Sequence, residues 1–273
     1  MIPAPFEYVR ADSAQDALAA LAEHGDEAKL LAGGQSLLPL MKLRLAVPAV
    51  VVDVSRASDL AYVREDGDTL AIGALTRHCD VAGDATVRRL APVLAHAAGL
   101  VGDAQVRHRG TIGGSTAHAD PSADVPTALL ALGASYLVTG PGGSRTVPAE
   151  EFATGFLETV LGPDELLTEI RVPATSGGWG YEKFTRRAID WATVAVAAVR
   201  RADGTTAVAL ANMGPTVLRA GAVEAALASG TSPDQAAAAA DEGTEPASDV
   251  TASAEYRRHL AQVLTARALD AAG

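Results

Sequence analysis

Two short glycine pairs constrain this chain more than any other feature of its sequence. AGGQS at residues 32–36 and TIGGS at 111–115 share one pattern, in which an apolar lead-in precedes two glycines and a small polar residue. Because glycine has no Cβ, its backbone N–H groups can come close to an anion. A helix that starts directly after such a loop adds further free N–H groups. Two loops of this kind on opposite sides of a cleft would suit the two phosphates of a dinucleotide.

An ordinary turn is the alternative interpretation of each pair, because glycine also supplies the positive φ that tight turns need. Neither loop matches the G-x-G-x-x-G pattern of Rossmann folds or the G-x-x-x-x-G-K-[ST] pattern of P-loops. The glycine pairs alone therefore favour neither of those two folds.

The order of strand and helix signals predicts an α+β architecture. An N-terminal body of about 170 residues alternates strands and helices, and a smaller C-terminal domain combines an antiparallel sheet with helices. Asp66-Gly67 and Asp203-Gly204 are typical hairpin turns. Residues 106–124 are predicted to form one long loop that ends where Asp124 caps a helix. TSGGWG at 175–180 is predicted to be the linker between the two domains.

Composition excludes several classes of function. The chain has 22 basic and 33 acidic residues, a formal charge of −11, which argues against a nucleic-acid or anionic-membrane partner. Its one cysteine, Cys79, cannot build a disulfide framework, a cysteine-based zinc site or an iron–sulfur cluster. We find no secretory signal and no apolar run of about 18 residues, so we expect a cytoplasmic protein without a membrane span or a metal site.

Three blocks in their order carry a resemblance to a known family: LLAGGQSLLPLMKLRLA (30–46), QVRHRGTIGGSTAHADPSADVP (105–126) and YEKFTRRAIDWATVAVAA (181–198). Together with LGPDELLTEIRVP (161–173) and AEYRRHLAQVLTARAL (254–269), they cover nearly the whole chain. The sequence resembles the FAD-binding medium subunit of the molybdenum hydroxylases, which include aerobic carbon monoxide dehydrogenase and bacterial xanthine dehydrogenase.

This resemblance implies a fold and a cofactor, FAD. The body would be a two-subdomain FAD-binding domain of the vanillyl-alcohol-oxidase (PCMH-like) type at residues 1–174, divided near residue 56, and a C-terminal flavoprotein domain would follow at 178–273. The two glycine loops would wrap the FAD diphosphate, and other residues would contact the ribose, the adenine or the isoalloxazine ring. The cofactor contacts implied are Ala32, Gly33, Gly34, Gln35, Ser36, Leu37, Thr111, Ile112, Gly113, Gly114, Ser115, His118, Asp124, Leu161, Lys183 and Trp191.

Two residues depart from the family pattern. Ser115 stands where many relatives have asparagine, and Ile189 stands where the carbon monoxide dehydrogenase type often has glycine. The serine keeps a hydrogen-bonding group but shortens it, whereas the isoleucine changes the crowding near the ring.

The family divides its chemistry between chains. A large molybdopterin subunit oxidises the substrate, a small subunit carries two [2Fe–2S] clusters, and FAD on the medium subunit passes the electrons to NAD, a quinone or another acceptor. A chain with one cysteine fits the last role, and we expect no catalytic acid or base in it. The alternatives are a stand-alone FAD-dependent oxidase or dehydrogenase of a small molecule, and a nucleotide-binding module without enzymatic activity.

Overall fold

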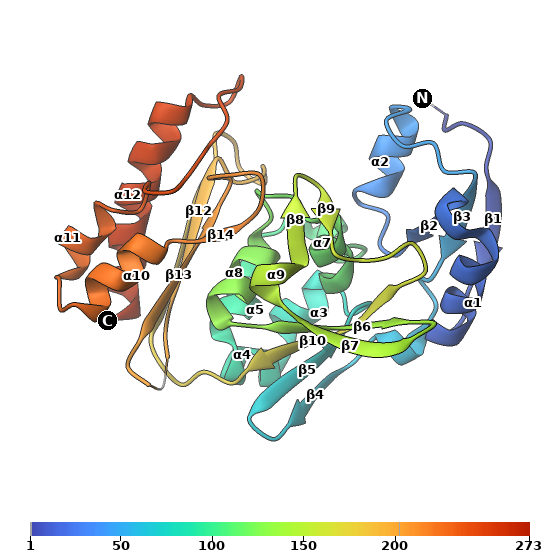
Figure 1. Ribbon diagram of the computed structural model, residues 1–273, viewed down its shortest axis with the longest axis horizontal. Helices are drawn as coiled ribbons and strands as arrows, with labels where there is room; N and C mark the ends of the chain where they lie inside the picture. Colours follow the sequence, from blue (N-terminus) through green and yellow to red (C-terminus); the bar gives the residue numbers. More distant parts are fainter. Residues whose placement is uncertain (1, 202) are drawn as a thin grey trace.

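A computed structural model describes residues 2–201 and 203–273. Met1, at the start of the predicted FAD-binding domain, and Ala202, beside the predicted Asp203-Gly204 turn, lie outside the described residues. Figure 1 shows three parts along the longest axis, which are an N-terminal part, a central part and a C-terminal part, each built on a sheet of its own.

The N-terminal part is a three-stranded parallel sheet in the order β1-β3-β2. Parallel neighbours need crossover connections, which the two helices supply. Ser13 caps α1 by accepting a hydrogen bond from the Asp16 N–H, and the alanine and leucine face of this helix is buried. The elements are β1 (Glu7–Arg10), α1 (Ala14–His24), η1 (Gly25–Glu27), β2 (Ala28–Leu31), α2 (Leu37–Lys42), β3 (Val50–Asp53) and η2 (Ser58–Leu60).

The central part is a five-stranded antiparallel sheet in the order β4-β5-β10-β6-β7. Asp66 and Gly67 join β4 to β5, with Gly67 at φ +62°, so the predicted hairpin is confirmed. The strands are β4 (Val63–Asp66), β5 (Thr69–Gly73), β6 (Ser135–Gly140), β7 (Gly143–Pro148) and β10 (Leu166–Pro173), and a small hairpin consists of β8 (Ala153–Gly155) and β9 (Glu158–Thr159).

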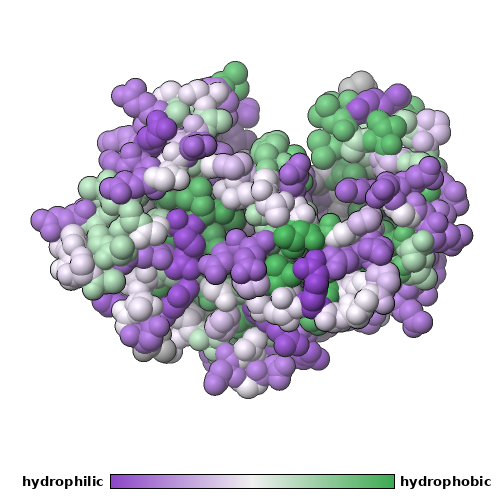
Figure 2. Space-filling model, in the orientation of Figure 1, coloured by the Kyte–Doolittle hydropathy of each residue, from purple (hydrophilic) through white to green (hydrophobic). Residues whose placement is uncertain are grey.

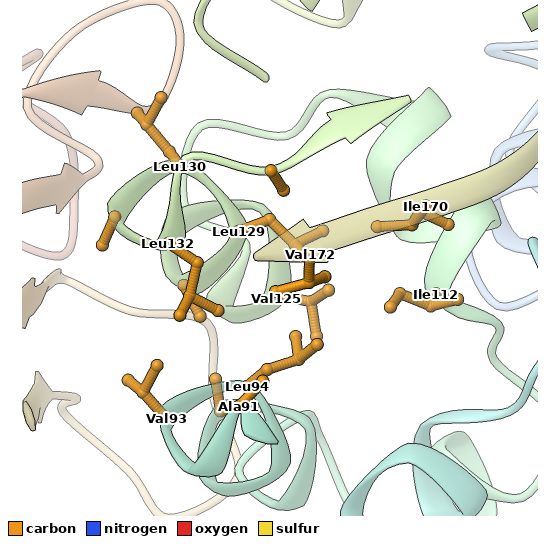
Figure 3. Close-up of a cluster of buried hydrophobic side chains, with 14 of the residues drawn as sticks. Ala91, Val93, Leu94, Ile112, Val125, Leu129, Leu130, Leu132, Ile170 and Val172 are labelled. Carbon is orange, nitrogen blue, oxygen red and sulfur yellow. The ribbon is translucent and has the colours of Figure 1, made fainter. Parts of the chain in front are cut away.

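Helices cover one face of this sheet and form the main hydrophobic core. Figure 3 shows side chains of α5, α8 and β10 converging, with Leu94, Leu129 and Val172 at the centre. Every residue of α8 is buried, because this helix lies between the central sheet and the C-terminal sheet. The helices are α3 (His78–Gly83), α4 (Ala85–Leu90), α5 (Pro92–Gly99), α6 (Ala104–Arg107), α7 (Ile112–His118), α8 (Asp124–Leu132) and α9 (Ala149–Phe152).

Two expectations for this part are wrong. The segment 106–124 is not one long loop, because α6 ends in it and α7 lies within it. Thr111 caps α7 by accepting a hydrogen bond from the Gly114 N–H at 3.1 Å, so the glycine pair lies inside a helical turn. Asp124 does not cap α8 either, because the N-cap residue is Ala123 and Asp124 is the first residue of the helix.

The C-terminal part is a four-stranded antiparallel sheet in the order β11-β12-β13-β14, covered by helices on its outer face (Figure 1). Gly204 has φ +84° between β12 and β13, as predicted for that turn. The elements are β11 (Trp179–Phe184), β12 (Val194–Arg200), β13 (Thr206–Ala211), β14 (Leu218–Arg219), α10 (Gly221–Ala228), α11 (Pro233–Ala237) and α12 (Ala254–Ala272). No helix in the described ranges is long and apolar enough to cross a membrane.

The glycines of the predicted linker have a packing role. A Cβ at Gly178 would overlap the carbonyl oxygen of Ala272, and one at Gly180 would overlap that of Ala268. These two glycines therefore let β11 lie directly against the backbone of α12. Trp179 and Gly180 are already part of β11, so the connection between β10 and β11 is shorter than the predicted linker at 175–180.

Candidate cofactor-binding site

A cleft of about 900 Å³ lies where the three parts meet. This volume is at the upper end of the range for small-molecule sites and suits a ligand as large as a dinucleotide. Every predicted cofactor contact except one lines the cleft: Ala32, Gly33, Gly34, Gln35, Ser36, Leu37, Thr111, Gly113, Gly114, Ser115, His118, Asp124, Leu161, Lys183 and Trp191.

Ile112 is the exception. Its side chain is fully buried in the core of the central part, and its N–H donates to the carbonyl oxygen of Thr76 at 2.9 Å. The residue supports the second glycine loop from behind and does not line the cleft.

The first glycine loop follows β2 and leads into α2. Among the described residues, the N–H groups of Gly33, Gly34, Gln35 and Ser36 have no protein acceptor, although all four residues line the cleft. Gly34 has φ +75°, a conformation that favours glycine and turns successive N–H groups toward one side. Ser36 is the N-cap residue of α2, but its hydroxyl makes no capping bond. This loop has the donors that a diphosphate needs.

The first glycine loop contacts the two residues directly before the second loop. A Cβ at Gly33 would overlap the carbonyl oxygen of Arg109 and would lie 2.7 Å from the Cα of Gly110. Gly33 is therefore required for the close approach of the N-terminal and central parts, independently of any ligand. This contact brings both loops to the same cleft.

The second glycine loop differs from the first in its hydrogen bonding. The N–H of Gly113 donates to Ala74, that of Gly114 to the Thr111 hydroxyl, and that of Ser115 to the Thr111 carbonyl. The expectation that this helix start offers free N–H groups is therefore wrong. The group that it can offer to a ligand is the Ser115 hydroxyl, which has no hydrogen-bond partner among the described residues.

Asp124 and Lys183 lie in one wall of the cleft and form an ion pair. The Asp124 carboxylate accepts hydrogen bonds from the Lys183 ammonium and from the Tyr181 hydroxyl, both at 2.8 Å. Lys183 also donates to the carbonyl oxygen of Leu100 at 3.3 Å. Burial raises the pKa of Asp124, and the neighbouring ammonium opposes that shift. This cluster links α8 to β11, and the role of both residues in cofactor binding stays a prediction.

Three further predicted contacts lie at other points of the cleft. His118 ends α7, and its partial burial lowers the pKa of its imidazole, so the ring is neutral near pH 7. Leu161 packs against the central core, whereas Trp191 is exposed at the edge of the cleft. Ile189, beside Trp191, has φ +66°. A β-branched side chain is strained at a positive φ, so glycine would suit this position better.

His78 is a residue of the cleft that the sequence did not single out. It is buried, and desolvation lowers the pKa of its imidazole to about 4. The Nδ1 atom of its ring has no hydrogen-bond partner among the described residues, whereas its backbone N–H donates to the carbonyl oxygen of Gly110 at 3.0 Å. No sequence motif distinguishes His78 from the other histidines, so no sequence signal could have found it.

The residues of the cleft fit FAD. Free N–H groups of the first loop and the hydroxyls of Ser36 and Ser115 suit a diphosphate, and a neutral His118 can donate a hydrogen bond. Apolar side chains such as Leu161 and Trp191 suit an aromatic ring system. Phosphate-binding groups and apolar walls in one cleft are the combination that a flavin dinucleotide requires.

Comparison with known proteins agrees with this geometry. Residues 4–175 match the family described as the FAD binding domain in molybdopterin dehydrogenase, and residues 179–272 match the CO dehydrogenase flavoprotein C-terminal domain. The carbon monoxide dehydrogenase medium chain of Hydrogenophaga pseudoflava is 44% identical over 100% of this chain and 98% of its own length. The caffeine dehydrogenase subunit beta of Pseudomonas sp. (strain CBB1) is 38% identical over 98% of this chain and 95% of its own length.

A solved structure of carbon monoxide dehydrogenase from Hydrogenophaga pseudoflava superposes with a TM-score of 0.95 at 45% identity, covering 100% of this chain and 98% of that chain. The predicted α+β fold, the cofactor FAD and the oxidoreductase class are therefore confirmed. The chain belongs to the family of FAD-binding medium subunits of the molybdenum hydroxylases, with a C-terminal domain of the carbon monoxide dehydrogenase type.

Proposed function

We propose that this chain passes electrons from the [2Fe–2S] clusters of a small partner subunit through FAD to an external acceptor, NAD or a quinone. The observation that carries the proposal is the cleft, in which free backbone donors of the first glycine loop meet apolar walls. A large molybdopterin subunit completes the complex in this proposal. We place the complex in the cytoplasm, which fractionation of the producing cells would test.

When bound, FAD supplies the electron-transfer chemistry that protein side chains lack. The chain's own residues bind and orient it. The N–H groups of residues 33–36 and the Ser115 hydroxyl hold the diphosphate, and Lys183 and Asp124 form one wall. Trp191 lies at the exposed edge of the cleft, where its indole can lie beside the ring system.

The relatives support a division of labour between chains. One similar chain is named for a carbon monoxide dehydrogenase and another for a caffeine dehydrogenase. Similar flavin chains therefore occur in enzymes named for very different substrates. This favours oxidation of the substrate on another subunit.

A reduction experiment tests the proposal. The isolated chain should bind about one FAD, and its flavin should stay oxidised when carbon monoxide, aldehydes or purines are added. A reduced small iron–sulfur subunit should then reduce the flavin. Failure to take up FAD, or an iron–sulfur partner that never reduces it, would overturn the proposal.

The same experiment addresses the stand-alone oxidase. Ile189 and Trp191 line the cleft and are exposed, so a small molecule could reach a ring beside them. Reduction of the flavin by a small substrate without any partner would establish that activity instead.

We also propose that the chain divides into a FAD-binding domain at 1–174, with subdomains on either side of residue 56, and a C-terminal domain at 178–273. The separate sheets support this division.

A further inference from the structure

Helix α2 and the turn after it present an apolar face to solvent. We call the side chains of Leu38, Leu43, Leu45 and Val47 the α2 face; between 37% and 73% of each residue is exposed. Figure 2 shows hydrophobic surface gathered in this region, on the lobe that carries α2 and the N terminus. A group of large exposed apolar side chains on one element is typical of an interaction surface.

The turn holds this face in a fixed conformation. Arg44 has φ +61°, where glycine is preferred at the end of a helix. The N–H of Leu45 donates to the carbonyl oxygen of Leu40 at 2.9 Å, and the Arg44 guanidinium donates to the carbonyl oxygen of Ile2. These hydrogen bonds therefore fix the left-handed conformation of Arg44. Leu43 and Leu45, the residues on either side of it, are exposed to solvent.

The charged side chains of the segment that carries the α2 face have one sign. No aspartate or glutamate occurs from residue 28 to residue 52, although the chain has 33 acidic residues. Lys42 and Arg44 are exposed, and neither forms an ion pair with any described residue. A complementary partner therefore has an apolar centre with carboxylates at its edge.

The α2 face is next to the cofactor cleft. Leu37, Leu40 and Ala46 come from the same segment and line the cleft, while the four residues of the face do not. A protein seated on this face would lie beside the cleft that binds FAD, and an electron donor has to dock close to that cofactor.

From these observations we infer that the α2 face is the docking surface for the small iron–sulfur subunit. The inference rests on the proposed function, since that function supplies the partner. A second copy of this chain fits less well, because a two-fold interface would bring two cationic, acid-free faces together. The large subunit need not approach the flavin, so nothing requires it at this edge of the cleft.

The double variant Leu43→Ser/Leu45→Ser tests the docking surface. Both side chains are exposed and outside the cleft, so folding and FAD content should be those of the unchanged chain. Its affinity for the purified small subunit, measured by titration calorimetry, should fall roughly 10- to 100-fold, as for central apolar contacts of an interface. Val250→Ser is the matched control, because Val250 is even more exposed but lies on a loop of the C-terminal part.

A charge variant gives an independent test. Lys42→Glu/Arg44→Glu should slow association with the small subunit at low salt, and the difference should shrink as salt is added. Unchanged affinity of the serine variant for the small subunit would overturn the inference. It would also be overturned if the variant lost only its binding to the large subunit, or only its self-association. If the unchanged chain binds FAD but no iron–sulfur subunit at all, the proposed function fails instead.

Discussion

The ammonium of Lys183 lies 2.8 Å from the carboxylate of Asp124, and this ion pair joins the C-terminal sheet to the buried helix α8. Both side chains are almost completely removed from solvent, and Tyr181 donates a further hydrogen bond to the carboxylate. In a buried ion pair each charge compensates the other, so removing one partner leaves the remaining charge buried and uncompensated.

We therefore expect Asp124→Asn to lower the free energy of unfolding by about 3–5 kcal/mol, because the Lys183 charge stays buried. Urea denaturation followed by circular dichroism measures this loss. Asp12→Asn is the control, since Asp12 pairs with Arg10 at the surface and should cost less than about 1 kcal/mol. Equal losses in both variants would contradict a special role for the buried pair.

The first glycine loop should be sensitive to a side chain at Gly34. Gly34→Val places a β-branched residue at φ +75° and displaces the free N–H groups, so FAD content should fall sharply. Gly143→Val is the control, because Gly143 also has a positive φ, with open space around it and no contact with the cleft. If the two variants retain the same FAD per chain by absorbance, the loop does not bind the diphosphate.

Gly114→Val is less informative than the pattern of the two loops suggests. A Cβ at Gly114 would lie 2.7 Å from the Thr111 hydroxyl oxygen, which caps α7. A valine there disrupts the cap as well as any ligand contact, so loss of FAD would have two causes.

The two tryptophans of the chain allow the ring position to be tested. Trp191 lines the cleft, whereas Trp179 packs beside His96 with ring centroids 5.4 Å apart. Adding FAD to the apoprotein should quench tryptophan emission strongly in Trp179→Phe, which keeps Trp191. Much weaker quenching is expected in Trp191→Phe. The opposite ranking would place the ring elsewhere.

Ile189 should be replaceable by glycine with a gain in stability. The positive φ of Ile189 costs roughly 1–2 kcal/mol, and glycine removes that strain while losing part of the gain to chain entropy. We expect Ile189→Gly to raise the free energy of unfolding by about 0.5–1 kcal/mol in the apoprotein. Ile189→Val keeps the branched Cβ and should show no gain, and a gain of the same size in both would rule out backbone strain as the cause.

Acid should weaken the segment that carries Leu161. The Glu165 carboxylate accepts hydrogen bonds from Arg145 and from the Gly162 N–H, and mainly the Arg145 bond lowers the pKa of Glu165 from 4.5 to about 2. A carboxyl group whose pKa is lower in the folded state stabilises that state at any pH above the pKa it has in the unfolded chain. This contribution disappears as the pH falls from about 4.5 toward 2. Glu165→Gln should make unfolding less dependent on pH in that window, as thermal melts would measure.

Local signals in the sequence predicted several parts of the structure correctly. Asp66-Gly67 forms the predicted hairpin, and Gly204 has the positive φ of the second predicted turn, because turns depend on neighbouring residues alone. The helical turn at 112–118 was missed because its two glycines have low helix propensity. It is stabilised by bonds to Thr76 and Ala74, which lie far away in the sequence.

The site shows the same limit. The resemblance identified residues that line the cleft, but it could not distinguish Ile112, whose side chain points into the core, from its neighbours. It also implied a contact of Asp124 with the ribose or adenine side of FAD, and it gave no sign that this carboxylate binds Tyr181 and Lys183. Which way a side chain faces depends on packing between segments, and motif spacing does not contain that information.

The complete burial of α8 has a consequence for how the chain can be divided. The hydrophobic core around this helix includes Val172 of the central sheet and Ala197 and Ala209 of the C-terminal sheet. A cut between the two sequence families, near residue 177, would therefore expose apolar surface on both fragments. The two family matches cover separate stretches of the sequence, but in this chain both stretches contribute to one hydrophobic core. We therefore expect the two parts to unfold together, and we expect neither part to be soluble alone.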